Sequence, residues 1–274
     1  VNGYATDEII DLYYLTRQSD ASVESLTTYL AADFATGAIG HKLVAGFDYA
    51  RRRNIYFDAY TDTIGQFDLT APEYFERDIA SYGPLIEDEY GGLLRTHGFY
   101  INNQMAIGPI QLLVGLRHDR YRAQSFGLDR EGGSAWLPRA GIVYNINPDS
   151  SIYASYVTGF EPPDPSINAP QFGGPFDPQD SRLFELGFKQ SLFNNRMFAS
   201  AAVYEIERTN VVVYANDPDD PDLNRQRGGE RSRGFELEVN GEVMPGLSII
   251  ANYAYNDSII TDDVDPALIG RTKE

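Results

Sequence analysis

Three consecutive arginines, Arg51-Arg52-Arg53, open the segment 51–92, whose side chains most suggest ligand binding. Aromatic residues follow in the same segment, among them Tyr56, Tyr74 and Tyr82. Guanidinium groups form paired hydrogen bonds with anions, and aromatic rings offer a ligand apolar surfaces on which to stack. The segment is therefore expected either to contact a ligand or to be a long loop whose rings pack a core of their own.

Two later segments also carry groups that could bind a ligand or an ion. Residues 161–182 contain Phe172-Gly173-Gly174-Pro175-Phe176, which predicts an ordered loop that presents the rings of Phe172 and Phe176. Residues 217–222 read Asp-Pro-Asp-Asp-Pro-Asp, and clustered carboxylates are ligands that Ca²⁺ prefers. The run lacks the glycine and the final glutamate of an EF-hand loop. A solvated acidic loop is therefore favoured, and no metal site is predicted.

Composition restricts the remaining chemistry. The 274 residues include 22 Lys and Arg against 40 Asp and Glu, a formal charge of −18, and no Cys. This charge repels phosphate backbones, which excludes a nucleic-acid partner. The chain offers no thiolate, and its three histidines, His41, His97 and His118, lack the Ser or Asp arrangement of a hydrolase. We expect no enzyme activity and no resident cofactor.

Apolar residues alternate with polar ones over most of the chain, which is the period of a β-strand with one wet face. From 235 to 243, Phe235, Leu237 and Val239 alternate with Glu236 and Glu238. The pattern predicts about eleven strands and no transmembrane helix. The expected strands are 4–16, 23–34, 41–50, 98–107, 111–119, 136–146, 151–160, 183–192, 196–213, 235–243 and 247–256.

Short and long connections alternate between these strands. The short links have turn chemistry and fall at 36–39, 108–109, 147–149, 193–195 and 244–246. The long links are expected at 51–92, 121–135, 161–182 and 214–231. Such sorting is typical of outer-membrane barrels, which have short periplasmic turns and long extracellular loops. A soluble β-sandwich is the alternative, but strands of about ten residues that end in Tyr or Phe favour a membrane barrel.

Several short motifs occur in an order that resembles the TonB-dependent outer-membrane receptors, specifically their ferric-siderophore branch. The motifs that carry this resemblance are His41-Lys42-Leu43, Gly46-Phe47-Asp48-Tyr49, Leu113-Val114-Gly115-Leu116-Arg117-His118-Asp119, Leu137-Pro138-Arg139-Ala140-Gly141, Glu185-Leu186-Gly187-Phe188-Lys189 and Gly229-Glu230-Arg231-Ser232-Arg233-Gly234-Phe235. Each motif is weak alone, whereas their order and spacing together are specific.

The resemblance implies an all-β fold, an antiparallel up-and-down transmembrane β-barrel. Residues 1–274 would be part of a single barrel domain, roughly half of a 22-stranded barrel, with the plug domain and the C-terminal strands outside the chain. It also implies active uptake of a ferric siderophore across the outer membrane of a Gram-negative bacterium. The TonB-ExbB-ExbD complex would act through an N-terminal region that is not in this chain.

The resemblance assigns the ligand to the extracellular loops and the upper barrel wall. The candidate ligand-binding residues are Arg51, Arg52, Arg53, Tyr56, Tyr74, Tyr82, Phe172 and Phe176. The arginines could instead pair with lipopolysaccharide phosphates or with loop carboxylates. Polar residues expected to face the lumen, and there either to contact the plug or to be hydrated, are Asp48, Arg117, Arg139, Glu185, Lys189, Glu236 and Glu238.

Two other functions fit the same strand pattern. A passive porin would have the same wall without a plug, so the plug sequence in the full gene would separate it from a receptor. A receptor for haem or an oligosaccharide would share the whole architecture, because the residues that select the ligand lie in the loops and the plug.

Overall fold

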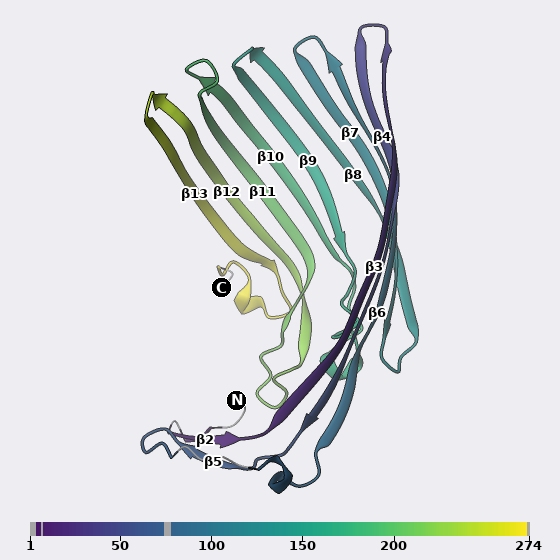
Figure 1. Cartoon of the computed structure of the whole chain (residues 1–274), viewed down its shortest axis with the longest axis vertical. Helices are drawn as coiled ribbons and strands as arrows, with labels where there is room; N and C mark the ends of the chain where they lie inside the picture. Colours follow the sequence, from purple (N-terminus) through teal and green to yellow (C-terminus); the bar gives the residue numbers. More distant parts are fainter. Residues whose placement is uncertain (1–3, 7, 74–77, 273–274) are drawn as a thin grey trace.

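A computed structural model describes residues 4–6, 8–73 and 78–272 (Figure 1). These residues form thirteen β-strands and three short 3₁₀ helices, η1 (Ile79–Tyr82), η2 (Pro170–Phe172) and η3 (Pro266–Leu268). None of the helices among them is long and apolar enough to cross a bilayer. The expected all-β fold is confirmed.

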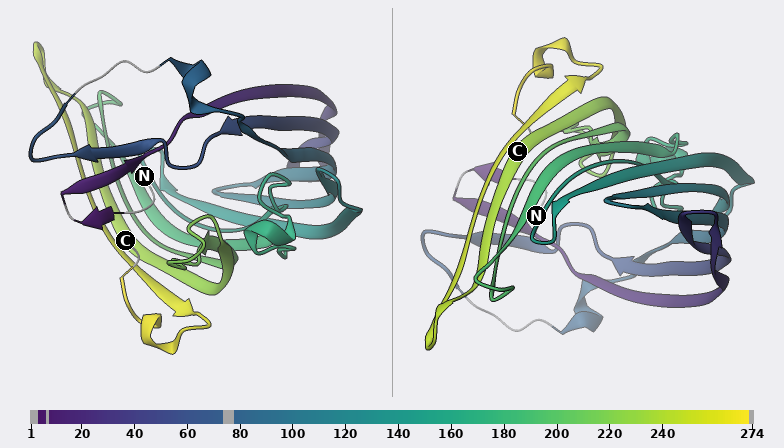
Figure 2. Two further views of the ribbon diagram at one scale, coloured as in Figure 1. Left: turned by 90° about the horizontal axis from the view of Figure 1, so that it is seen from below. Right: turned by 90° about the horizontal axis from the view of Figure 1, so that it is seen from above.

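Ten of the strands form one antiparallel sheet in which each strand pairs with the next large strand along the chain. In sheet order they are β3 (Leu15–Thr36), β4 (Ile39–Tyr60), β6 (Ile86–Ile107), β7 (Ile110–Ser125), β8 (Arg130–Asn147), β9 (Ser150–Glu161), β10 (Gln179–Leu192), β11 (Met197–Tyr214), β12 (Asn224–Met244) and β13 (Leu247–Asp262). This up-and-down order curves into a tilted wall with one concave and one convex face (Figures 1 and 2).

The prediction of a single strand at 4–16 is wrong. Its residues form β1 (Tyr4–Thr6) and β2 (Ile9–Leu12), and β2 pairs with β5 (Gly65–Asp68) in a separate three-stranded sheet. This small sheet lies beyond the end of the wall where the long connections are found (Figure 1). The alternation of apolar and polar residues is weakest in this segment, and two short strands next to a loop produce that weak signal.

The short turns share one rim of the wall, as expected, but the long connections are shorter than expected. The link predicted at 51–92 is confined to the stretch between β4 and β6, which contains β5 and η1, because β4 continues to Tyr60 and β6 begins at Ile86. The other three loops shrink in the same way, to 126–129, 162–178 and 215–223. Beyond the apolar band, polar and apolar side chains occur on both strand faces, so the alternation that marks a strand disappears while the backbone pairing continues.

The register divides the side chains of the wall between its two faces, because residues paired across strands point to the same side. One register row places Leu30, Ala45, Ile101, Leu116 and Pro138 together. Leu30 is 81% exposed and Ile101 is 48% exposed. Soluble monomers seldom expose an apolar band of this kind, whereas a lipid bilayer solvates it.

Candidate functional site

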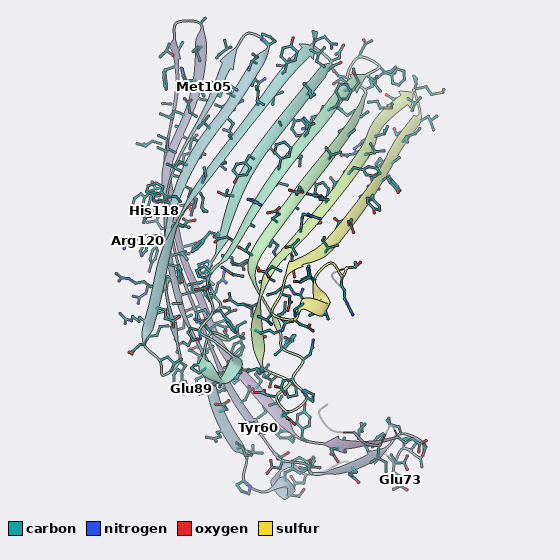
Figure 3. The ribbon with its side chains drawn as sticks, turned by 180° about the vertical axis from the view of Figure 1, so that it is seen from behind. Tyr60, Glu73, Glu89, Met105, His118 and Arg120 are labelled. Carbon is teal, nitrogen blue, oxygen red and sulfur yellow. The ribbon has the colours of Figure 1, made fainter. Side chains whose placement is uncertain are left out.

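The concave face has a hollow of about 980 Å³ at the end with the long connections. Its walls come from the far ends of β3, β4, β6, β11 and β12 and from the loop 162–178. Six aromatic residues line it: Tyr13, Tyr56, Tyr60, Tyr90, Phe172 and Tyr214. Figure 3 labels Tyr60 at this end of the wall. Because opposite parts of the sheet contribute, the hollow fixes which strand face is concave.

Three of these rings form a continuous aromatic surface. Tyr56 on β4 is paired in register with Tyr90 on β6, and their ring centroids are 5.0 Å apart and stacked. Phe172 of η2 meets Tyr90 edge to face, at 5.8 Å between centroids. The structure therefore brings the candidate residues Tyr56 and Phe172 into one hollow, although they are distant in the sequence. Their contact with a ligand stays a prediction.

A paired guanidinium and carboxylate lie beside this surface. Arg17 Nε donates to Asp58 Oδ1 and Arg17 Nη2 donates to Asp58 Oδ2, both at 2.7 Å. The Arg17 guanidinium also lies 5.7 Å from the ring centroids of Tyr56 and Tyr90. Such bidentate, ring-stacked geometry is specific to arginine. Sequence analysis missed both members, because 41 positions separate them and nothing local links them.

The pair lies beyond the apolar band, where both of its members meet water. The Arg17 hydrogen bond lowers the pKa of Asp58 below its usual value, although partial burial opposes this shift. Burial and the nearby Asp58 carboxylate raise the pKa of the Tyr90 hydroxyl. Asp58 thus stays ionised and Tyr90 stays protonated at neutral pH, so Arg17 is neutralised within the site.

The other charged residues that line the hollow are acidic. They are Asp88 on β6, Asp164 in the loop 162–178 and Asp222 in the loop 215–223. Among the lining residues the only basic side chain is Arg17, which Asp58 already neutralises. The described wall of the hollow is therefore aromatic with a negative charge.

The arginine triplet is divided between the two faces of the wall, because it lies in β4 and not in a loop. Arg52 lines a second concave hollow of about 330 Å³, together with Glu161 and Asp164. Arg51 and Arg53 point to the convex face, where they pair with Glu24 and Asp20 of β3. Successive strand residues point in opposite directions, so the three arginines do not share one surface, and their contact with a ligand stays a prediction.

Two further candidate ligand residues, Tyr82 and Phe176, lie away from the aromatic surface. Tyr82 in η1 packs against Tyr14, with 5.6 Å between ring centroids. Phe176 is only 7% exposed, and its backbone N–H donates to Asn168 Oδ1 at 2.7 Å. It therefore packs the core of the loop 162–178 and does not present its ring, as had been expected. Tyr74 lies outside the described residues.

The acidic run 217–222 behaves as a turn in the structure. Asp217 Oδ1 accepts the backbone N–H of Asp219 at 2.9 Å, which is a local turn contact. No group of three or more acidic or histidine side chains in the described part of the chain is arranged to hold a metal ion.

The part of the concave wall between the hollow and the short turns carries the polar residues expected to face the lumen. Arg117 Nη1 donates to Asp48 Oδ2 at 2.5 Å, and Arg117 Nε donates to Asp119 at 2.8 Å. Arg139 Nε donates to Asn102 Oδ1 at 2.7 Å, and Lys189 Nζ lies 5.0 Å from the ring centroid of Tyr153. The register places three further residues on the same face: Glu185, Glu236 and Glu238. Contact of these residues with a plug stays a prediction.

Comparison with known proteins gives one family and a consistent set of relatives. The chain is 28% identical over 263 residues to the metal-pseudopaline receptor CntO of Pseudomonas aeruginosa, covering 85% of this chain and 34% of that protein. It is 26% identical over 249 residues to the ferrichrome outer membrane transporter/phage receptor of Escherichia coli, covering 87% of this chain and 32% of the relative. The chain thus spans about a third of the length of these curated relatives.

A solved structure shows the same fold. The ferric preacinetobactin receptor BauA from Acinetobacter baumannii superposes with a TM-score of 0.75 at 20% sequence identity, over 97% of this chain and 40% of that one. The family model described as TonB dependent receptor-like, beta-barrel, matches residues 2–272. The curved ten-stranded wall, its apolar convex band and this match lead to one conclusion: the chain belongs to the β-barrel domain family of the TonB-dependent receptors.

Proposed function

We propose that the protein takes up a ferric siderophore across the outer membrane in a TonB-dependent manner, and that the ligand binds in the 980 Å³ hollow. The observation that carries the proposal is the aromatic surface of Tyr56, Tyr90 and Phe172 on the concave face. Its position at the end with the long connections is where a ligand arriving from outside would enter. The relatives named as ferrichrome, metal-pseudopaline and ferric preacinetobactin receptors support this class of ligand.

The charge of the described wall favours a neutral or cationic chelate. Asp88, Asp164 and Asp222 line the hollow, and its one arginine is already paired. An anionic chelate would meet uncompensated carboxylates there, and like charges within about 8 Å repel even at physiological salt. Two of the three arginines that were expected to attract an anion, Arg51 and Arg53, lie on the convex face, and Arg52 lines a separate concave hollow beside Glu161 and Asp164.

Energy for uptake would come from the TonB-ExbB-ExbD complex acting on a plug in the whole protein. The concave residues Arg117 and Asp48 form a charged site that such a plug could contact.

The test is iron-limited growth of a deletion strain complemented with the full-length gene, on a panel of purified ferric siderophores. The panel would contain cationic, neutral and anionic chelates. We expect growth on a neutral or cationic chelate, and loss of this growth when tonB is also deleted. Growth that persists without tonB would identify a passive porin and overturn the proposal.

Point variants of the full-length receptor locate the ligand. Tyr56→Ala and Phe172→Ala should each weaken ligand binding about tenfold, because each removes a stacking ring from the hollow. Tyr82→Ala is the matched control, since it removes a tyrosine ring that packs outside the hollow. Equal losses in all three variants would show that the hollow does not bind the ligand.

A further inference from the structure

A row of three charged residues crosses the concave face inside the aromatic hollow. Arg17 of β3 is paired in register with Asp58 of β4, which is paired with Asp88 of β6. All three side chains line the hollow. The row therefore holds two carboxylates and one guanidinium. Like charges at directly opposite strand positions destabilise a sheet, so a second cation would be favourable here.

The guanidinium of this row is committed to one of the two carboxylates. Arg17 Nε and Nη2 each donate to one oxygen of Asp58, both at 2.7 Å. Among the described residues the Asp88 carboxylate has no ion-pair partner and accepts no hydrogen bond. Arg17 is also the only basic side chain among the described residues that line the hollow. Asp88 thus has an unmatched negative charge that is open to the hollow.

Aromatic rings lie on both sides of the row. Tyr56 and Tyr90 occupy the next concave positions toward the short turns, and Tyr60 occupies the next one toward the loops. The Arg17 guanidinium lies 5.7 Å from the ring centroids of both Tyr56 and Tyr90. These rings already stack against a cation of the chain itself. Their faces can therefore stabilise positive charge at this place.

The other two unpaired carboxylates of the hollow are placed less well to select a ligand. Asp164 Oδ1 accepts the backbone N–H of Ser166 at 2.9 Å, so it shapes the turn of the loop 162–178. Asp222 lies in the loop 215–223, outside the paired sheet. Asp88 lies on a paired strand, two positions from Tyr90, so the carboxylate and the rings keep a fixed spacing.

Rings beside one open carboxylate match the chemistry of a primary ammonium group. The ring faces attract its positive charge, and the carboxylate accepts hydrogen bonds from its N–H groups. A quaternary ammonium lacks these donors, and a neutral amide lacks the charge. The hollow, at about 980 Å³, is much larger than one ammonium group. The cation would therefore be one arm of a larger ligand.

We infer that Asp88 selects siderophores that carry a primary ammonium arm, and that this arm lies between the Asp88 carboxylate and the rings of Tyr56, Tyr60 and Tyr90. The inference rests on the proposed uptake function, because it names the substituent by which the ligand of that hollow is recognised. One carboxylate, and not the acidic wall as a whole, distinguishes an ammonium chelate from a neutral one.

The test compares ferric chelates in matched pairs that share their iron-binding groups. One member of each pair ends in a primary amine and the other in its N-acetyl amide, and both hydroxamate and catecholate pairs are used. Isothermal titration calorimetry of the purified full-length receptor gives the Kd values at low and at physiological salt. Wild type should bind the amine member of at least one pair about tenfold more tightly than the acetylated member, and this preference should fall as salt rises.

Asp88→Asn should abolish the preference by weakening binding of the amine member about tenfold, while binding of the acetylated member stays unchanged and shows that the hollow is intact. Asp88→Glu should keep most of the preference, because the charge remains. The matched control is Glu89→Gln, which removes a charge from the next position of β6 (Figure 3). Its side chain points to the convex face, so the control should keep the preference of wild type.

Equal affinity of wild type for both members of every pair that binds would overturn the inference and leave the proposed uptake function standing. An equal loss for both members in Asp88→Asn would also overturn it, by assigning Asp88 a structural role. The same applies if Glu89→Gln loses the preference to the same extent, or if no pair binds while another chelate supports growth. Failure of every ferric siderophore to bind or to support growth would defeat the proposed function and the inference together.

Discussion

Two regions of the convex face lie at the same height and use arginine in opposite ways. On β10–β12 each of the arginines Arg182 and Arg233 has a glutamate partner on the neighbouring strand. On β4–β7 the arginines face one another across the strands, and among the described residues their carboxylate partners come from β3 alone. The two arginines of the first region are each neutralised by a glutamate, whereas Arg95 and Arg122 of the second have no ion pair among the described residues. Whether an arginine on a barrel wall is neutralised can therefore be judged only when its cross-strand neighbours are known.

The largest effect is expected where charge is moved into the apolar band that both regions share. Leu237 on the convex side of β12 is 46% exposed. Leu237→Arg should destabilise the full-length barrel by roughly 2–4 kcal/mol, because no water or phosphate reaches a guanidinium near the bilayer midplane. A refolding titration in liposomes measures this. Glu238→Gln on the concave face is the control and should change little, and the reverse order would mean that the two faces are exchanged.

The ion pair Arg17–Asp58 on the concave face tests what happens when an arginine loses its carboxylate partner. Asp58→Asn should destabilise the extended strand ends by about 0.5–1 kcal/mol, since Arg17 loses its bidentate partner but remains half exposed to water. Because the folded pKa of Asp58 is lowered, its contribution is complete above the unfolded pKa of about 3.9 and is lost as the pH falls through the folded value.

Urea unfolding of the wild type between pH 7 and pH 3 should therefore show a loss of stability below about pH 4 that is smaller in Asp58→Asn. Other carboxylates contribute the part common to both proteins. Identical pH profiles for the two proteins would mean that the pair contributes nothing to stability.

The comparison predicts that removing the glutamate partners on β11 would leave that region with unpaired arginines, like those on β6 and β7. Glu205→Gln/Glu207→Gln leaves Arg182 and Arg233 without partners on the convex face. The full-length variant should bind bisphosphorylated lipid A about three- to tenfold more tightly than wild type, by creating a phosphate site. Unchanged binding would show that unpaired arginines on this face do not suffice.

The smallest effect is expected from relieving repulsion between the arginines that are paired in register on β4, β6 and β7. Arg95 lies between Arg51 and Arg122 in one register row. In detergent without lipopolysaccharide, Arg95→Gln should stabilise the full-length barrel by about 0.2–1 kcal/mol, and adding bisphosphorylated lipid A should reverse the order. Thermal unfolding with and without the lipid measures both values. Destabilisation in both conditions would indicate that Arg95 has a protein partner.

The wall itself could be predicted from the sequence because its signals are local. Alternation at 235–243 and the turn residues near 108–109 each act within a few positions. The extensions of the strands could not be predicted in this way. Residues 51–60 carry polar and apolar side chains on both faces, so the strict alternation that marks a strand with one wet face is lost.

Only part of the candidate site could be predicted from the sequence, for the same reason. Tyr56 and Phe172 were candidates because rings in polar segments are conspicuous, and the structure brings them together around Tyr90. Arg17 and Asp58 were not found, because their pairing depends on a register between strands that no local pattern specifies. The division of Arg51 and Arg52 between two faces follows from strand periodicity, once β4 is known to extend past residue 50.

The extension of β3, β4 and β6 beyond the apolar band has a consequence for how the hollow could change. Tyr56, Asp58 and Tyr90 are held by continuous backbone pairing, so they lose little conformational entropy when a ligand arrives. Phe172 lies on the loop 162–178, whose length and sequence can vary without breaking the sheet. Sequence changes that alter ligand preference should therefore accumulate in that loop. The rings on the strands should stay in the same place while such changes occur.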